Sequence, residues 1–256
     1  MLTRLLTGIL LLCAAAQAAD GGEGRAIHVK YDSCRHGFGD ETVTVNMFLI
    51  NANGDTTTRR VKTLILERKE SFDYSLIQFM DPPDVRGAGL LTYQNPRGED
   101  QQWLYLPELR RVKVISSQNK SGSFMGSEFA YEDITGNSLD KFEYRKIGEA
   151  DLEGMPCHLI EKKPLFTSGY VRVKEWIDKE KCLLRRAEMI DRKGSLLKVE
   201  LDEDWRLYGN TWKSDRLTMI NLQTGKKTVL VFSDRKHRVG LKEGDFTQPS
   251  MQRVRF

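Results

Sequence analysis

Short segments with strand character follow one another along most of this chain, and this repetition constrains the fold more than any single motif. The segments alternate apolar and polar residues and are separated by turn residues such as Asn51–Asp55 and Arg192–Gly194. With almost no helical pattern between them, they predict a mainly β fold with one large antiparallel sheet or barrel. The expected strands are Thr42–Ile50, Thr56–Lys69, Ser71–Met80, Arg86–Tyr93, Gln101–Leu106, Arg111–Ser116, Leu139–Ile147, Met155–Lys163, Tyr170–Ile177, Cys182–Asp191, Leu196–Leu207, Thr211–Leu222 and Lys226–Asp234.

One segment ahead of the strands, Gly24–His36, has helical spacing. Ile27, Tyr31 and Cys34 fall at positions i, i+4 and i+7 on a single face, and Gly37 follows as a stop signal. A sheet of more than ten strands must curl, close or split. Curling creates a concave apolar face, which one or two helices cover or which holds a ligand.

An insert from Ser117 to Asn137 interrupts the strand pattern. Its centre, Ser123–Asp133, is rich in small residues and yet carries four large apolar ones: Phe124, Met125, Phe129 and Tyr131. Apolar groups on a mobile connector cover either the protein's own core or a ligand. We expect the insert to form a lid over the concave face, together with Ile27 and Tyr31. The alternative is that these side chains simply complete the core, as aromatic residues more often do.

The N-terminus has the features of a bacterial secretory signal. A short positive region ending at Arg4 precedes the apolar run Leu5–Ala16, and Ala16-Gln17-Ala18 offers a cleavage site. The apolar run is far shorter than the ~20 residues that span a bilayer. We therefore expect residues 1–18 to be removed near Ala18, and the length of residues 19–256 suits one large β-domain as well as two smaller ones.

Composition argues against nucleic-acid binding and leaves the pairing of the cysteines undecided. Loss of Arg4 lowers the formal net charge from +4 to +3, which is too small for a typical nucleic-acid binder. An exported chain meets oxidising conditions, so Cys157 and Cys182 could form a disulfide, with Cys34 left over. The favoured alternative is that all three are small buried apolar residues.

No catalytic or metal-binding constellation can be assembled from the sequence. The four histidines are scattered and no pair has zinc-ligand spacing, so neither a metal nor a cofactor is expected. Ser117–Lys120 matches S-x-x-K, but the companion motifs of that enzyme class are missing. A hydrolase with Ser117 or Ser123 as nucleophile lacks a histidine partner, and we expect no enzyme activity.

Clusters of charge have a simple interpretation and a more specific one. We interpret the basic clusters at Arg110–Lys113, Arg185–Arg186, Lys226–Lys227 and Arg235–Arg238 as solvated strand ends that protect sheet edges. The specific alternative is contact with an anionic partner such as a membrane surface. The acidic pairs Asp202/Asp204 and Glu132/Asp133 are typical of solvated faces.

Several motifs resemble those of the outer-membrane lipoprotein-sorting protein family, in its LolA-like branch associated with RND-type exporters. They are Phe79–Pro83 leading to Gly87–Tyr93, then Gln102–Pro107 with Arg110–Lys113, the insert Ser123–Asp133, and Trp176–Lys179 with Leu183–Arg185. The resemblance covers most of the chain from about Gly24, and it implies that residues 19–256 form a single domain in the periplasm. It implies a half-open antiparallel barrel of the LolA/LolB type, whose concave apolar face is covered by helices.

The resemblance also implies a function. Proteins of this shape carry acyl chains across the periplasm, so the expected cargo is a lipid or an acylated protein moving towards the outer membrane. Within the matching motifs, Leu91 and Trp103 are further candidates for contact with an acyl chain. The alternative function is a scaffold or accessory subunit of an inner-membrane RND-type exporter, which would hold no cargo.

Overall fold

The computed structural model describes residues 22–68, 72–135 and 138–253. The expected signal sequence and its cleavage position near Ala18 lie outside these residues. The first described element is a helix formed by residues 22–33. Within the described ranges, no helix is both long and apolar enough to cross a membrane.

A single antiparallel sheet contains all thirteen strands of the described chain, in the order β6-β5-β4-β3-β2-β1-β13-β12-β11-β10-β9-β8-β7. Each expected strand is present. The strands are β1 (Asp40–Ile50), β2 (Thr56–Leu66), β3 (Tyr74–Asp81), β4 (Gly89–Tyr93), β5 (Gln101–Leu106), β6 (Arg111–Val114), β7 (Phe142–Leu152), β8 (Met155–Pro164), β9 (Tyr170–Asp178), β10 (Leu184–Asp191), β11 (Leu196–Tyr208), β12 (Thr211–Asn221) and β13 (Lys227–His237).

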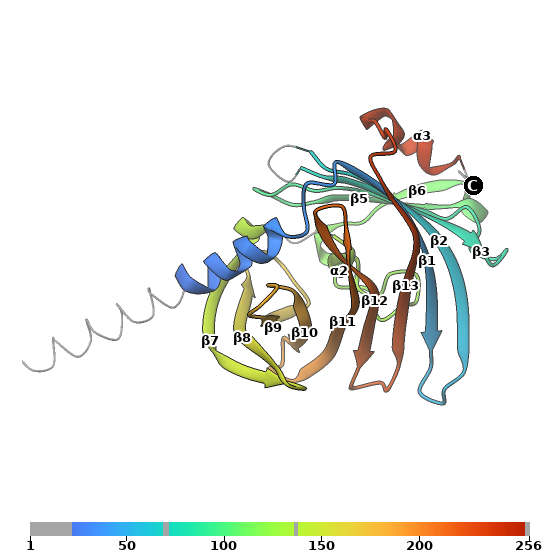
Figure 1. Cartoon of the computed structure of the whole chain (residues 1–256). Coiled ribbons are helices and arrows are strands. Elements are labelled where there is room, and N and C mark those ends of the chain that lie inside the picture. The colour runs from blue at the N-terminus through green and yellow to red at the C-terminus, as the bar shows by residue number, and fades with distance from the viewer. Residues whose placement is uncertain (1–21, 69–71, 136–137, 254–256) are drawn as a thin grey trace, which may run out of the picture.

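Pairing of the first strand with the last gives the sheet two arms. Met47 of β1 lies opposite Leu230 of β13, so β1–β6 extend to one side and β7–β12 to the other. Figure 1 shows both arms curving around a hollow that contains the short helix α2 (Tyr131–Ile134). Because β6 and β7 are not paired with each other, the barrel stays open, and the expectation of a curved half-open barrel is confirmed.

Several element boundaries differ from those expected, among them those of β4, β7 and the N-terminal helix. The strand expected from Arg86 begins only at Gly89, because residues 82–87 form a turn closed by a hydrogen bond from Val85 N to Pro82 O at 3.2 Å. Residues Leu139–Lys141 form a 3-10 turn, so that β7 starts at Phe142. The N-terminal helix ends at residue 33, three residues before its predicted end. The remaining short helices are η2 (Pro107–Leu109), η3 (Ser117–Asn119), η5 (Glu243–Asp245) and α3 (Gln248–Met251).

The two sheet edges are protected in different ways. At one edge, β6 is short and carries the exposed Arg111 and Lys113, as expected for the basic cluster there. At the other edge, the N-terminal helix lies beside β7 (Figure 1). A Cβ atom added at Gly24 would lie 2.8 Å from the backbone nitrogen of Lys146, so the helix approaches the strand backbone directly. Lys146 also binds Glu23 at 2.7 Å.

A second apolar cluster, which the sequence did not indicate, lies on the outer face of β2–β5. The C-terminal residues Phe246 and Met251 cover Leu64, Leu76 and Leu91 there. In Figure 1, α3 lies on this outer side of the sheet. The Gln78 amide donates hydrogen bonds to the backbone oxygens of Ser250, Met251 and Arg253 at 3.3, 3.3 and 2.7 Å. The C-terminal segment is therefore a structural cover for the convex face.

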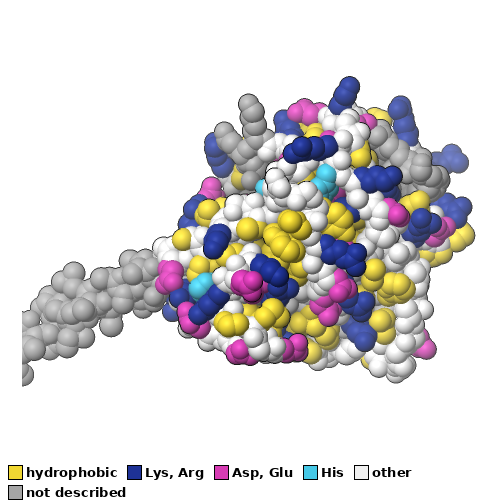
Figure 2. Space-filling view, viewed as in Figure 1, with side chains coloured by type: hydrophobic (Ala, Val, Ile, Leu, Met, Phe, Trp, Pro, Cys, Tyr) yellow, Lys and Arg dark blue, Asp and Glu magenta, His cyan; other side chains and the backbone are white. Residues whose placement is uncertain are grey.

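The structure shows how far the cysteines are buried and which partners the basic cluster Arg235–Arg238 has. Cys157 and Cys182 are buried free thiols, whereas the free thiol Cys34 is only half-buried. In the cluster Arg235–Arg238, Lys236 and Arg238 are exposed as expected, whereas Arg235 and His237 are not solvated. Arg235 donates to Glu41 at 2.7 Å, and His237 Nε2 lies 2.8 Å from the same buried carboxylate. On the face seen in Figure 2, basic and acidic side chains are interspersed.

Candidate functional site

The hollow between the sheet, the N-terminal helix and the insert contains a cavity of about 340 Å³. This volume lies at the lower end of the range of small-ligand sites. Much of its wall is apolar and comes from β1, β2, β12 and β13, including Val45, Met47, Val61, Leu217, Leu230 and Phe232. A larger groove of about 840 Å³ elsewhere is lined by Phe142, Leu165 and Phe166 together with charged residues such as Lys120 and Lys141. We take the cavity of about 340 Å³ as the candidate functional site because it lies on the concave face, between the helix residue Tyr31 and the insert residues Phe124 and Phe129.

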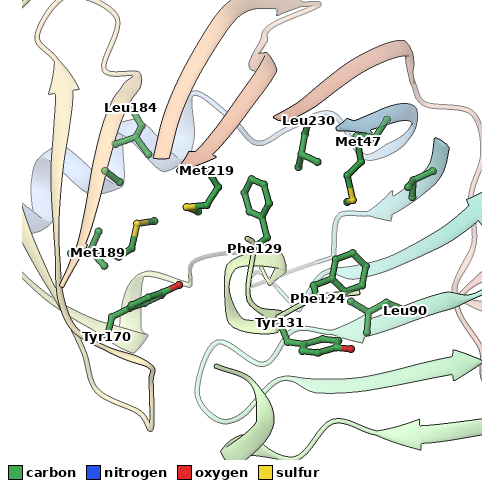
Figure 3. Packing of buried hydrophobic residues seen from close by; sticks show 14 of the residues in the cluster. Met47, Leu90, Phe124, Phe129, Tyr131, Tyr170, Leu184, Met189, Met219 and Leu230 are labelled. Atoms are coloured by element: carbon green, nitrogen blue, oxygen red, sulfur yellow. The ribbon is translucent and has the colours of Figure 1, made fainter. Parts of the chain in front are cut away.

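Aromatic side chains of the insert fill the centre of the hollow. Phe124 is 0% exposed and Phe129 is 2% exposed, and both line the cavity. Figure 3 shows Phe129 pointing between Met219 and Leu230, with Phe124 beside Leu90. The insert therefore contributes both to the core and to the cavity wall.

Hydrogen bonds fix the insert to the sheet. Arg59 of β2 donates to the backbone oxygen of Met125, and the Thr228 hydroxyl of β13 accepts from Glu128 N at 2.9 Å. Asn221 of β12 donates to the Glu128 carboxylate at 2.8 Å. Within the insert, Phe124 N donates to the Phe129 oxygen at 2.8 Å. These contacts fasten the insert to β2, β12 and β13, where it forms part of the cavity wall.

The eight candidate residues separate into two groups. Six belong to the concave side: Tyr31, Phe124 and Phe129 line the cavity, while Ile27, Met125 and Tyr131 pack in the surrounding core. Leu91 and Trp103 lie instead in the outer cluster beneath the C-terminal segment. Alternate side chains of a strand point to opposite faces. On these strands the inward residues are Leu90 and Leu104, so the assignment of Leu91 and Trp103 to the cavity is wrong.

Strand β11 places charged side chains on the concave side. Glu200 lies opposite Ala187 and Met219, and Asp202 lies opposite Leu217. Both carboxyl groups line the cavity. Asp202 is only 8% exposed, so the prediction that Asp202 and Asp204 form a solvated acidic pair is wrong for Asp202. The apolar alternation of this strand predicted a strand correctly but did not show that Glu200 and Asp202 point into the cavity.

The acidic pair in the insert is not solvated either. Glu132 accepts hydrogen bonds from the Ser168 hydroxyl at 2.6 Å and from Gly169 N at 2.9 Å. Asp133 accepts from the Tyr170 hydroxyl at 3.0 Å, and Lys198 lies 3.6 Å from its carboxylate. Burial raises the pKa of Asp133 above its usual value, although Lys198 opposes the shift. These contacts join the insert to the β8–β9 side of the sheet.

Burial controls the protonation of the carboxyl pair on β11. It raises the pKa of Asp202 to about 7, even though the positive charge of Arg35 opposes the shift. Burial likewise raises the pKa of Glu200 well above its usual value, and the nearby Asp202 adds to this effect. Burial also lowers the pKa of Lys213, in the same cavity, to about 8. The cavity therefore has a polar end beside its apolar wall.

A buried ionic cluster anchors the N-terminal helix over the concave face. Glu175 of β9 accepts from Lys162 of β8 at 2.6 Å and lies 2.5 Å from Nε2 of His28 in the helix. Burial alone would raise the pKa of Glu175, but Lys162 and His28 together lower it to about 2. The His28 ring also packs on Tyr144, with centroids 4.2 Å apart. Nothing in the sequence spacing indicated this cluster.

The two serines considered as nucleophiles have other partners. Ser117 donates its hydroxyl hydrogen to Glu99, and Ser123 donates to the backbone oxygen of Ser127 at 2.6 Å. Lys120, the lysine of S-x-x-K, donates to the backbone oxygen of Asp100 at 2.6 Å. Within residues 22–68, 72–135 and 138–253, no group of three or more His, Cys, Asp and Glu side chains is arranged to hold a metal ion.

Comparisons with known proteins agree on the fold. The model of a family described as "Uncharacterized protein" matches residues 71–253. A domain assigned as an outer membrane lipoprotein-sorting protein, from Vibrio parahaemolyticus, is 37% identical, with a TM-score of 0.88, coverage of 91% of this chain and 100% of that domain. A DUF1329 family protein from Desulfovibrio piger is 28% identical, with a TM-score of 0.86 and coverage of 91% and 99%. No match is found among curated proteins.

One further solved structure is similar in fold alone. It is a LolA superfamily protein from Nitrosomonas europaea, which is 19% identical to this chain. The match covers 88% of this chain and 98% of that protein, with a TM-score of 0.73. The half-open barrel described above is therefore a LolA-like fold.

Proposed function

Because this chain belongs to the LolA-like family of outer membrane lipoprotein-sorting proteins, we propose that it is a periplasmic carrier of acyl chains. The observation that supports this function is the apolar cavity enclosed by the curved sheet, the N-terminal helix and the fixed insert. The cargo would be a lipid or an acylated protein on its way to the outer membrane. This function needs neither a covalent step nor a cofactor.

The physical basis of carriage is removal of the acyl chain from water. Each methylene group buried in the cavity stabilises the complex by roughly 0.8 kcal/mol. Access requires a movable wall, and the insert is fixed by its hydrogen bonds to the sheet. The N-terminal helix is held by the buried contact of His28 with Glu175, so we assign the opening motion to the segment that follows the helix, which lines the cavity through Arg35, His36 and Phe38. Release would follow when a membrane or acceptor binds the chain more strongly.

A cavity-filling variant tests the proposed function. Leu230→Trp places a larger side chain in the cavity wall, and we expect it to reduce binding of a fluorescent fatty-acid probe at least tenfold. Val171→Trp is the matched control, since Val171 is an exposed residue of β9. Thermal unfolding of both variants shows whether the fold is retained. Equal probe binding by wild type and Leu230→Trp would mean that this cavity is not the acyl-chain site.

The alternative function is an accessory subunit of an RND-type exporter that uses sheet edges and basic patches. Exposed Arg111 and Lys113 on β6 would be the first contacts to test. Such a scaffold needs no cargo. Failure of the wild-type protein to bind any acyl probe, with its fold intact, would favour this function.

A further inference from the structure

The polar end of the cavity contains a buried carboxyl oxygen that lacks a partner. Asp202 Oδ1 is buried and has no hydrogen-bond partner among the described residues, while the Asp202 carboxyl group shares a hydrogen bond with Glu200 when one of the two is protonated. The residue is 8% exposed and lines the cavity. Buried polar atoms in folded proteins almost always have a partner, because an unpaired one retains its desolvation cost. A hydrogen-bond donor that enters the cavity from outside would satisfy this oxygen.

Arg35 presents the opposite chemistry in the same cavity. Its Nη1 donates to the Tyr31 hydroxyl at 2.9 Å, and its guanidinium lies over the Tyr31 ring, 4.9 Å from the centroid. It forms no salt bridge with any carboxylate in the described part of the chain. A guanidinium has five N–H donors, and its planar fork suits carboxylate and phosphate oxygens. Tyr31 therefore orients a cation whose remaining donors are available for an oxyanion.

The size of the cavity restricts the apolar part of the ligand. About 340 Å³ between Met47, Val61, Leu230 and the insert suits one acyl chain better than the several chains of a larger lipid. The charged end, formed by Arg35 and β11, is part of this same cavity. A ligand with one chain in the apolar part would place its head group among these charges.

We propose that the cavity binds a single-chain amphiphile whose head group carries an oxyanion for Arg35 and an adjacent hydrogen-bond donor for Asp202. This is the chemistry of a lysophospholipid, in which a phosphate lies beside an ammonium or hydroxyl group. The inference rests on the proposed acyl-chain function and specifies its cargo class. Lys213 is a weaker candidate for the oxyanion, since it lies 3.7 Å from the Phe38 ring centroid and 4.0 Å from Glu41.

The test compares four lauroyl ligands on the protein purified after export. Lysophosphatidylethanolamine has both head-group features, laurate has only the oxyanion, monolauroylglycerol has only donors, and lauroyl methyl ester has neither. Calorimetric titration should give the lysophospholipid the highest affinity, at least tenfold above each of the others. Equal affinities for all four would overturn the head-group assignment while leaving acyl-chain binding in place. Binding of none would overturn both proposals.

Two variants assign the head-group contacts to individual residues. Arg35→Gln should weaken lysophospholipid and laurate about tenfold and leave monolauroylglycerol unchanged. Asp202→Asn should reduce the preference for lysophospholipid over laurate. The matched controls are Arg145→Gln and Asp55→Asn, which change exposed groups that do not line the cavity. If Arg35→Gln weakens all ligands equally, or if Asp202→Asn leaves the preference unchanged, the corresponding contact is excluded.

Discussion

Two buried carboxylates on the concave side of the same sheet have opposite environments. Glu175 is paired with Lys162 and His28, and its pKa is lowered to about 2. Asp202 keeps an unpaired oxygen beside a cavity, and burial raises its pKa to about 7. The difference indicates their roles. A satisfied buried charge anchors the helix to the sheet, whereas an unsatisfied one beside a cavity is suited to a ligand.

The largest expected loss of stability comes from replacing Glu175, the carboxylate of the buried cluster with Lys162 and His28. Glu175→Gln leaves Lys162 and His28 buried without their carboxylate, and loss of one partner of a buried pair costs about 3–5 kcal/mol. Urea unfolding at pH 7 measures this free energy. Glu161→Gln, at the surface pair with Arg145, is the control and should cost less than about 1 kcal/mol. Equal losses of unfolding free energy in the two variants would show that the Glu175 cluster stabilises the protein no more than a surface ion pair does.

The close contact between the N-terminal helix and β7 should give the next largest effect. Gly24→Ala introduces a Cβ atom 2.8 Å from the backbone nitrogen of Lys146, and the helix must move away. We expect a loss of about 1–3 kcal/mol, as for other overpacked sites. Gly22→Ala is the matched control, since a Cβ atom there meets nothing within 4 Å. Hydrogen exchange of the helix amides should rise in Gly24→Ala alone; unchanged exchange would contradict this packing.

Replacing Asp202, unlike the two changes above, should increase the free energy of unfolding. Asp202→Asn avoids the ionisation of a buried carboxyl group, so we expect it to stabilise the ligand-free protein by about 1–2 kcal/mol at pH 8. The same variant should lose head-group preference, as expected where a binding site is kept at the expense of stability. Urea unfolding checks the stability change, and a destabilised Asp202→Asn would indicate that the carboxylate is part of the structural framework.

The pH dependence of stability separates the two carboxylates further. The pKa of Glu175 is lower in the folded state, so its contribution is complete above pH 4.5 and is lost as the pH falls towards 2. The pKa of Asp202 is higher in the folded state, so ionisation destabilises the fold as the pH rises from about 4 to 7. The charged groups that act on Asp202 are Glu200, Arg35, Glu175 and Arg185. The stabilising effect of Asp202→Asn should therefore grow from pH 4 to pH 8, and an effect independent of pH would contradict this account.

The strands could be predicted because their signals are local. Alternation and turn residues indicated every strand, and they failed mainly at boundaries such as the turn before Gly89, where tertiary hydrogen bonds decide. The burial of Phe124 and Phe129 also followed from their type. Motif matching alone could not decide the side of the sheet on which Leu91 and Trp103 lie, because a shift of one residue exchanges the two faces.

The polar parts of the site could not be predicted from spacing. Glu175, Lys162 and His28 come from three elements, and only the curvature of the sheet brings them together. On β11, the apolar residues drew attention to one face of the strand, while the functional candidates Glu200 and Asp202 lie on the other. Charged residues on the concave face of a curved sheet contradict the usual pattern of burial, and such exceptions are expected at functional sites.

The most direct test of acyl-chain carriage is native mass spectrometry of the exported protein, purified without detergent from the periplasm of a Gram-negative host. The wild type should carry a defined adduct that organic extraction releases as a single-chain lipid, and Leu230→Trp should be bare. A wild-type protein that is bare, and stays bare after incubation with envelope lipids, would contradict the proposal that this cavity carries acyl chains.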